Sequence, residues 1–185
     1  MDGLCMLHNT KTCSKERTIA RAKSSNIVHV SLAYDWGSQT DNPALIWDEV
    51  QAVFTRLKPE FPGIKFYLHS LGGKDGSIYC DICRQIRSSD AVIIDLSTNN
   101  LNVILELGIA IGFGANIFIL RSKHYKQSGG LSDLNGILEY RFSRRAGRMN
   151  FEADFPHSLE RKLSAAARKH LRELSDQAEA TGSDR

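Results

Sequence analysis

Two carboxylates stand alone in a long apolar stretch of this 185-residue chain. Between Ala91 and Leu120, the only charged residues are Asp95 and Glu106. An unpaired ionised carboxylate in apolar surroundings costs several kcal/mol, and its pKa rises as a result. Glu106 therefore either pairs with a basic side chain, such as Arg84 or Arg87, or faces a cleft. The second possibility points to chemistry, and the small neighbours Gly108 and Ala110 leave room for another element or a ligand.

The elements that must position these carboxylates alternate between strands and helices. Period-two or continuous apolar runs predict strands, and apolar residues three and four apart predict helices. The expected strands are 26–33, 64–69, 91–96, 117–120 and, at an edge, 138–142. The expected helices are 43–58, 78–88, 101–113 and 155–178. This order predicts an α/β fold with a doubly wound, Rossmann- or flavodoxin-like parallel sheet of about five strands, flanked by helices.

The predicted fold places both carboxylates near one end of the sheet. Asp95 ends the central strand, and ligands of open α/β sheets bind outside the carboxyl ends of the strands. The helix that holds Glu106 is apolar on nearly every side, so we expect it to be buried. Residues 103–120 are almost long enough to span a bilayer, but Glu106, Asn116 and three glycines favour a buried helix followed by a strand.

The segment SSDAVIIDLSTNNLNVILELGIAIGFGANIFIL, Ser88–Leu120, resembles the core of the nucleoside 2-deoxyribosyltransferase family. It is especially similar to the branch of 2′-deoxynucleoside 5′-monophosphate N-glycosidases. The likeness covers about 33 residues closely and the element order of residues 26–120 loosely. It implies cleavage of a base–sugar N-glycosidic bond, by hydrolysis or transfer and without a cofactor or metal. The implied substrate is a nucleoside or nucleotide, and an antiviral-defence effector in bacteria is one implied role.

The resemblance also implies roles for individual residues. Glu106 falls on the catalytic glutamate of the family, which attacks or stabilises the anomeric carbon of an oxocarbenium-like transition state. Asp81 lies one residue away from the spacing of the second acid, with Asp95 as the alternative. Candidate substrate contacts are the aromatic rings of Tyr34 and Trp36 for the base, and Ser97, Asn100 and Asn102 for phosphate or sugar hydroxyls. Asparagines stand where the monophosphate branch has small hydroxyl residues, which suits ribose hydroxyls equally well.

Two other functions fit the same elements. TIR domains share this architecture and use a helix-borne glutamate to cleave NAD, and VHVSLAYDW (residues 28–36) resembles their first strand and loop. A nucleotide-sensing or scaffold domain with a degenerate site is the non-enzymatic alternative. In that case we expect Glu106 to be sealed off and bonded to an arginine. Members of both enzyme families commonly assemble as homo-oligomers, and the terminal helix is one candidate contact.

The formal net charge of +3 belongs to the N-terminus. Residues 1–25 hold five basic and two acidic residues, so the remaining body is balanced and is not a basic nucleic-acid-binding domain overall. Within the body, basic residues gather between Arg121 and Arg148. Arg141, Arg144 and Arg145 are candidates to hold a phosphate, and binding of an oligonucleotide by this segment stays open.

The chain ends and the cysteines complete the sequence predictions. Residues 1–25 lack the apolar region of a secretory signal and are expected to be a disordered extension. The body, 26–178, is expected to be one domain, followed by a frayed tail, 179–185. Cys80 and Cys83 lie in a predicted helix as half-buried free thiols, although a zinc site with Cys5, His8 and Cys13 is the alternative. The absence of a disulfide framework favours a cytoplasmic protein. The polar residues within 103–120 argue against a membrane segment.

Overall fold

The computed structural model describes residues 25–38, 40, 42–72, 78–124 and 139–182. Its helices are α2 (Asn42–Leu57), α3 (Ile78–Ser88), α4 (Leu101–Gly112) and α5 (Phe155–Gly182). Its strands are β1 (Ile27–Ala33), β2 (Lys65–Ser70), β3 (Ala91–Asp95), β4 (Ile117–Ser122), β5 (Glu139–Arg145) and β6 (Arg148–Phe151). Every predicted element is present within a few residues of its expected bounds.

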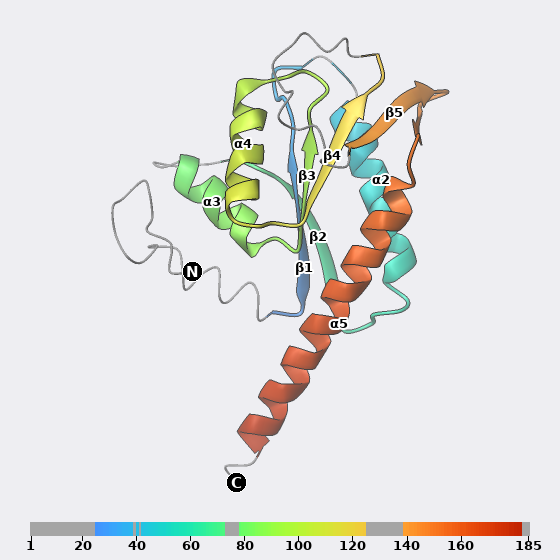
Figure 1. The fold of residues 1–185 in the computed structure, drawn as a ribbon. Helices are drawn as coiled ribbons and strands as arrows, with labels where there is room; N and C mark the ends of the chain where they lie inside the picture. The colour runs from blue at the N-terminus through green and yellow to red at the C-terminus, as the bar shows by residue number, and fades with distance from the viewer. Residues whose placement is uncertain (1–24, 39, 41, 73–77, 125–138, 183–185) are drawn as a thin grey trace.

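The strands form one sheet in the order β2-β1-β3-β4-β5-β6. Neighbouring strands from β2 to β5 are parallel, and β6 pairs with β5 in the antiparallel direction. Helices α3 and α4 cover one face of this sheet, and α2 and α5 cover the other (Figure 1). The doubly wound α/β fold is therefore confirmed, with six strands rather than about five.

Two apolar clusters hold the three layers together, one on each face of the sheet. Successive side chains of a strand point to opposite faces. In β3, Ala91 and Ile93 pack in the cluster with α2 and α5, while Val92 and Ile94 pack in the cluster with α3 and α4. All five residues of β3 are buried, which explains the continuous apolar run in the sequence.

The arginine-rich segment near residue 145 is a β-hairpin, whereas the sequence predicts an edge strand followed by a polar segment. Arg145 of β5 faces Arg148 of β6, so only Ala146 and Gly147 connect the strands. Both have positive φ angles, of 50° and 71°, as a two-residue type I′ turn requires. The sequence prediction stopped too early because β6 is only four residues long and its turn lacks the usual Asn-Gly signal.

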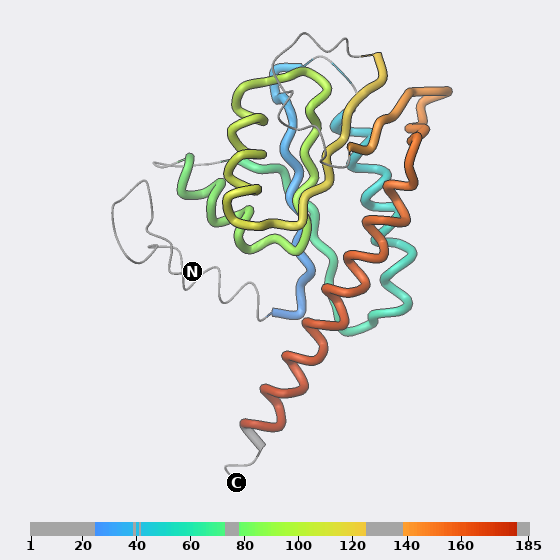
Figure 2. The backbone as a smooth tube through the Cα atoms, viewed as in Figure 1, coloured from blue at the N-terminus to red at the C-terminus, as the bar shows by residue number. Residues whose placement is uncertain are grey.

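The terminal helix is longer than the sequence predicts, since α5 continues to Gly182 through residues that were expected to fray. Gln177, Ala178, Glu179 and Ala180 have good helix propensity, so the helix persists after its apolar stripe ends. Its last turns project past the edge of the sheet (Figure 2). The prediction for residues 1–24 lies outside the described part of the chain. No helix among the described residues is long and apolar enough to cross a bilayer.

The two cysteines of the predicted helix form no disulfide, as expected. Cys80 is buried and Cys83 is half-buried on α3. The other members of the alternative zinc set, Cys5, His8 and Cys13, lie outside the described residues.

A buried histidine ties α5 to the amino ends of the central strands. His170 is 4% exposed, with Nδ1 2.6 Å from the carbonyl oxygen of Ser25 and Nε2 3.1 Å from Oδ1 of Asp90. Both partners can only accept a hydrogen bond, so the ring satisfies both as an imidazolium. The hydrogen bond to Asp90 is the main reason why the pKa of His170 is raised.

Replacement of His170 by glutamine is expected to destabilise the protein more at pH 6 than at pH 9. A histidine whose pKa is raised on folding stabilises the native state below its unfolded pKa, near 6.5, and loses this contribution as the pH rises through its folded pKa. A hydrogen bond to a charged group contributes about 1.5–3 kcal/mol, which sets the expected loss at pH 6. Urea unfolding at the two pH values measures it, and an equal loss at both would mean that His170 is neutral.

Candidate active site

The order of the strands defines where a ligand site is expected. The chain runs from β1 outward to β2 and then returns to β3 on the other side of β1. Such a reversal leaves a crevice outside the carboxyl ends of the two central strands, where α/β proteins bind ligands. The loop after β1 presents Tyr34 and Trp36 at this end. The loop after β3 presents residues 97–100, and α4 begins directly after it.

Glu106 is a buried carboxylate without a partner among the described residues. It is 9% exposed and shares the inner side of α4 with Val103, Leu107 and Ala110. The described residues offer it no hydrogen bond and no ion pair, and burial alone raises its pKa to about 7. At neutral pH this carboxyl group therefore exchanges readily between its protonated and ionised forms.

The arginines of α3 do not neutralise Glu106. Arg84 forms an ion pair with Asp81 at 3.7 Å, and the guanidinium of Arg87 lies 5.4 Å from the centre of the Phe113 ring. Phe113 follows Glu106 by seven residues, or about two helical turns, so both lie on the flank of α4 that faces α3. Of the two features expected of a degenerate sensor site, Glu106 shows burial but, among the described residues, no bond to an arginine.

Comparison with known proteins does not identify a family. No protein-family model matches the chain, and no curated protein matches it. A crystal structure of a conserved protein from Enterococcus faecalis V583 aligns with 75% of this chain and 98% of its own, at 16% identity and a TM-score of 0.37.

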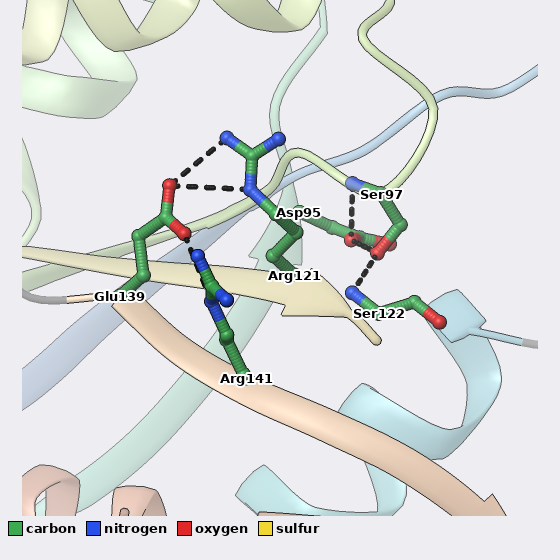
Figure 3. Close-up of polar contacts among 6 residues, drawn as sticks. All are labelled: Asp95, Ser97, Arg121, Ser122, Glu139 and Arg141. Atoms are coloured by element: carbon green, nitrogen blue, oxygen red, sulfur yellow. Dashed lines mark hydrogen bonds and ion pairs between the residues drawn. The ribbon is translucent and has the colours of Figure 1, made fainter. Parts of the chain in front are cut away.

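Asp95 is occupied by structural hydrogen bonds. Its Oδ1 accepts from the backbone N–H of Ser97 at 3.0 Å and from the Ser97 hydroxyl. The Ser97 Oγ in turn accepts from the backbone N–H of Ser122, so this contact ties the ends of β3 and β4 together (Figure 3). Burial raises the pKa of Asp95, and hydrogen bonds from Ser97 and Asn42 act in the opposite direction.

The two carboxylates also belong to different layers. Asp95 comes two residues after Ile93 and so points to the same face of β3, toward α2 and α5, where it interacts with Asn42 at the start of α2. Glu106 instead lies on α4, on the other face of the sheet. Asp95 and Ser97 therefore hold the ends of β3 and β4 together by hydrogen bonds. The structure does not pair Asp95 with Glu106.

Two asparagines at the start of α4 differ in their hydrogen bonds: the side chain of Asn100 caps the helix, whereas the side-chain oxygen of Asn99 has no partner among the described residues. Asn100 caps the helix, with its Oδ1 accepting from the backbone N–H of Asn102 at 2.9 Å. The side chain of Asn102 is exposed one turn before Glu106 on the same flank of the helix. Asn99 has a φ of 50°, and its buried Oδ1 has no hydrogen-bond partner within the described structure.

Asn99 lies in the loop that the sequence indicated as a candidate binding segment, but it was not singled out there as its neighbours Ser97 and Asn100 were. The residue type itself could have indicated the positive φ of Asn99, because asparagine is one of the few residues that adopt such a conformation readily. Its unsatisfied oxygen lies beside the helix start and is buried from solvent.

The two aromatic residues after β1 stack on each other. The ring centres of Tyr34 and Trp36 are 5.0 Å apart, with an angle of 24° between the planes. Trp36 is 67% exposed, whereas Tyr34 is half-buried and interacts with the hydroxyl of Ser70 at the end of β2. The free side of this aromatic pair is a surface on which a nucleobase can stack.

Asp81 lies on a different side of α3 from the one that meets α4. Gln85, one turn later, donates a hydrogen bond to the carbonyl oxygen of Gly72 in the loop after β2. Residues four apart share a helix face, so Asp81 is directed toward the same loop. The structure therefore does not bring Asp81 and Glu106 together.

The three candidate phosphate arginines do not form one cluster. Alternation along β5 directs Arg144 to the opposite face from Arg141 and Arg145. Arg144 donates to Oδ1 of Asn42, and Arg141 lies 3.7 Å from the carboxylate of Glu139, which also binds Arg121 at 2.9 Å (Figure 3). Arg145 is exposed at the tip of the hairpin.

Proposed function

We propose that this protein cleaves the N-glycosidic bond of a nucleoside or nucleotide, with Glu106 as the catalytic carboxylate. The observation that supports the proposal is the state of Glu106, which is 9% exposed, unpaired within the described structure and has a pKa near 7. A structural carboxylate at this depth normally has a compensating partner. Retention of an unpaired one near the carboxyl ends of the strands fits a group that acts on a ligand.

The main group that this reaction requires from the protein is a carboxylate next to the anomeric carbon. As the bond between the anomeric carbon and the base nitrogen breaks, its electron pair leaves with the base, which takes up a proton. The sugar becomes oxocarbenium-like, and the ionised Glu106 stabilises this positive charge or forms a covalent ester with the anomeric carbon. Water then adds to the anomeric carbon, or hydrolyses the ester and frees the Glu106 carboxylate. Its remaining proton replaces the one that the base took from the solvent, and the free sugar or sugar phosphate is released.

Groups at the same end of the sheet suit the two halves of such a substrate, although Tyr34 packs with the apolar cluster of α2 and α5, on the face opposite α4. The stacked pair of Tyr34 and Trp36 offers a face for the base. Asn102, on the same flank of α4 as Glu106, suits sugar hydroxyls. Asp95 is already engaged by Ser97, so we assign it to support of the strand ends. Asp81 forms an ion pair with Arg84 and does not lie with Glu106, so we assign no side chain as the second acid.

A substrate panel tests the proposal. Purified protein is incubated with deoxynucleosides, ribonucleosides, their 5′-monophosphates and NAD, and free base is measured by chromatography. We expect free base from at least one of them, and its identity distinguishes a nucleoside or nucleotide glycosidase from an NAD glycohydrolase. The matched controls are Glu106→Gln, which should release none, and Glu179→Gln, the same change at an exposed site on α5.

Two results would contradict the proposal. Release of base by the wild type and by Glu106→Gln at equal rates would exclude Glu106 as the catalytic group. No free base from any member of the panel, with binding of one of them by calorimetry, would instead support the nucleotide-sensing alternative.

A further inference from the structure

The outward face of the β5–β6 hairpin is polar and basic. Successive side chains of a strand point to opposite faces, and directly paired residues of neighbouring strands share a face. The face toward α2 and α5 carries Tyr140, Phe142, Met149 and Phe151, which pack in the apolar cluster there. The opposite face carries Glu139, Arg141, Ser143, Arg145, Arg148 and Asn150. Its three arginines and its asparagine are exposed, so this face presents arginines to the outside while the other belongs to the core.

The basic end of the hairpin extends past the neighbouring strand. Strand β4 pairs with β5 only as far as Phe142, whereas β5 and β6 remain paired up to Arg145 and Arg148. The last residues of the hairpin therefore form a two-stranded ribbon beyond the end of β4 (Figure 1). On its inner face, Arg144 donates a hydrogen bond to Oδ1 of the buried Asn42 at the start of α2. Because this contact and the two-residue turn fix the ribbon, its outward arginines are held in place before a partner binds.

Two arginines face each other at the tip of the ribbon. Arg145 and Arg148 are direct cross-strand partners, a position in which Cβ atoms lie about 5 Å apart and like charges destabilise a sheet. Neither arginine forms an ion pair with a described residue. The described part of the chain therefore holds two repelling charges together without an acid that offsets them. An anionic partner would make this arrangement favourable.

The same face carries more arginines than carboxylates. Arg121 of β4 is the cross-strand partner of Arg141 and lies on the same face. Glu139 serves both, with Oε1 2.9 Å from Nη2 of Arg121 and Oε2 3.7 Å from Nε of Arg141 (Figure 3). The neighbouring Lys123 and Glu152 form an ion pair of their own at 3.1 Å. One carboxylate is thus shared by two guanidinium groups, and the arginines of the tip add positive charge that no described acid neutralises.

We propose that the outward face of the β5–β6 hairpin binds double-stranded DNA, with the ribbon in the major groove and its arginines on the phosphates. A planar guanidinium group offers paired N–H donors that match the oxygens of a phosphate. The strands of a ribbon lie about 5 Å apart, and the major groove of B-DNA, about 12 Å wide, admits such a ribbon. The sequence left binding of an oligonucleotide by this segment open, and the hairpin favours a duplex. This contact does not involve Glu106, so it is independent of the proposed function.

The composition of the face favours duplex DNA over other anionic partners. Proteins that hold single strands stack the bases on aromatic rings, but the aromatic side chains of this hairpin all point to the core. Interfaces with other proteins depend on aromatic or apolar anchors, which the outward face lacks. A segment that binds a membrane inserts apolar side chains, whereas the tip consists of Ala146 and Gly147. Interfaces with DNA, by contrast, are polar and strongly basic.

The salt dependence of DNA binding tests the proposal. The fluorescence anisotropy of a labelled DNA duplex of about 20 base pairs measures binding by the full chain. If Arg141, Arg145 and Arg148 each contact one phosphate, affinity should fall about 40-fold between 50 and 200 mM salt. The double variant Arg145→Gln/Arg148→Gln should lose only about 4-fold over this range, because each lost phosphate contact lowers the slope by about 1. It removes two opposed like charges, so urea unfolding should show a stability at least equal to that of the wild type.

The matched control is Arg161→Gln/Arg172→Gln, which removes the same charge from exposed positions on α5 and should keep the slope of the wild type. An equal loss in both double variants would mean that binding follows the net charge, and would overturn the proposal. So would a wild type that does not bind the DNA duplex at 50 mM salt, or that binds the single strand or the RNA duplex of the same sequence more tightly. Sedimentation with phosphatidylserine vesicles, lost in Arg145→Gln/Arg148→Gln and without binding of DNA, would assign the face to a membrane instead. None of these measurements follows base release, so their failure would leave the proposed function untouched.

Discussion

Glu106→Gln is expected to lose base release by a factor of about 10³ or more and, at the same time, to raise the stability of the folded protein above pH 7. Glutamine has nearly the same shape as glutamate, so the apolar packing of α4 is retained. It can neither carry the negative charge that an oxocarbenium-like sugar requires nor form a glycosyl ester. A loss of activity together with a gain in stability is the pattern expected of a functional residue that the fold tolerates at a cost.

The gain in stability follows from the pKa of Glu106. Folding raises this pKa from 4.5 to about 7, so between these values the folded protein binds more protons than the unfolded chain. Stability contributed by this group therefore falls as the pH rises from 4.5 to 7 and is constant above. At 1.36 kcal/mol per pKa unit, the ionised side chain costs about 3 kcal/mol at pH 8. Glutamine removes this cost but must itself be desolvated, so the net gain is smaller than that.

Urea unfolding at pH 5 and pH 8 measures the effect. The difference between Glu106→Gln and the wild type should be small at pH 5 and reach its maximum at pH 8. Glu179→Gln is the matched control and should leave stability almost unchanged at both values, because its side chain is exposed. A Glu106→Gln variant that is less stable than the wild type at pH 8 would mean that the carboxylate has favourable partners in the folded state.

The sequence predicted the layers of the fold because its periodicities are strong. Residues 91–96 form a continuous apolar run, and the central strand in the structure is indeed buried on both faces. Elements with weak patterns were missed or cut short. Strand β6 is four residues long, and the last turns of α5 depend on helix propensity without an apolar stripe.

The candidate site was predicted less completely, since sequence patterns do not state which face of the sheet a residue meets. Asp95 and Glu106 are close in the chain and share an apolar context, which suggested a common site. The alternation of β3 instead directs Asp95 toward α2, where it contacts Asn42. The alternation of faces along β5 likewise separates Arg144 from Arg141, although both belong to one basic segment of the sequence.

Whether an arginine pairs with Glu106 also depends on tertiary structure. Arg84 and Arg87 are close enough in sequence to reach it, but their directions on α3 lead them to Asp81 and Phe113. The exposed face of α4 has the same origin. Hydropathy shows that a helix is apolar all round, but it does not show that the outer side, with Leu101 and Leu105 exposed, stays uncovered by the rest of the chain.

The pH dependence of the reaction is the second large effect that we expect. As nucleophile or counter-charge, Glu106 must be ionised, and in the free protein it has a pKa of about 7. The value of kcat/KM should therefore fall tenfold per pH unit below 7 and be about 100-fold lower at pH 5 than on a plateau above pH 8. A glutamate with its ordinary pKa would keep the activity nearly constant down to pH 5.

The direction of this profile decides the chemical role of Glu106. The measurement should use a substrate without a phosphate monoester, because the second ionisation of a monoester, near pH 6, would titrate in the same range. Activity that falls as the pH rises through 7 would mean that the protonated side chain is the active form and donates a proton to the leaving base. Activity that rises through 7 supports the anionic role, because only the ionised carboxylate can meet the positive charge that develops on the sugar. A flat profile between pH 5 and 9 would mean either that Glu106 keeps its ordinary pKa in the folded protein or that it takes no part in the rate-determining chemistry.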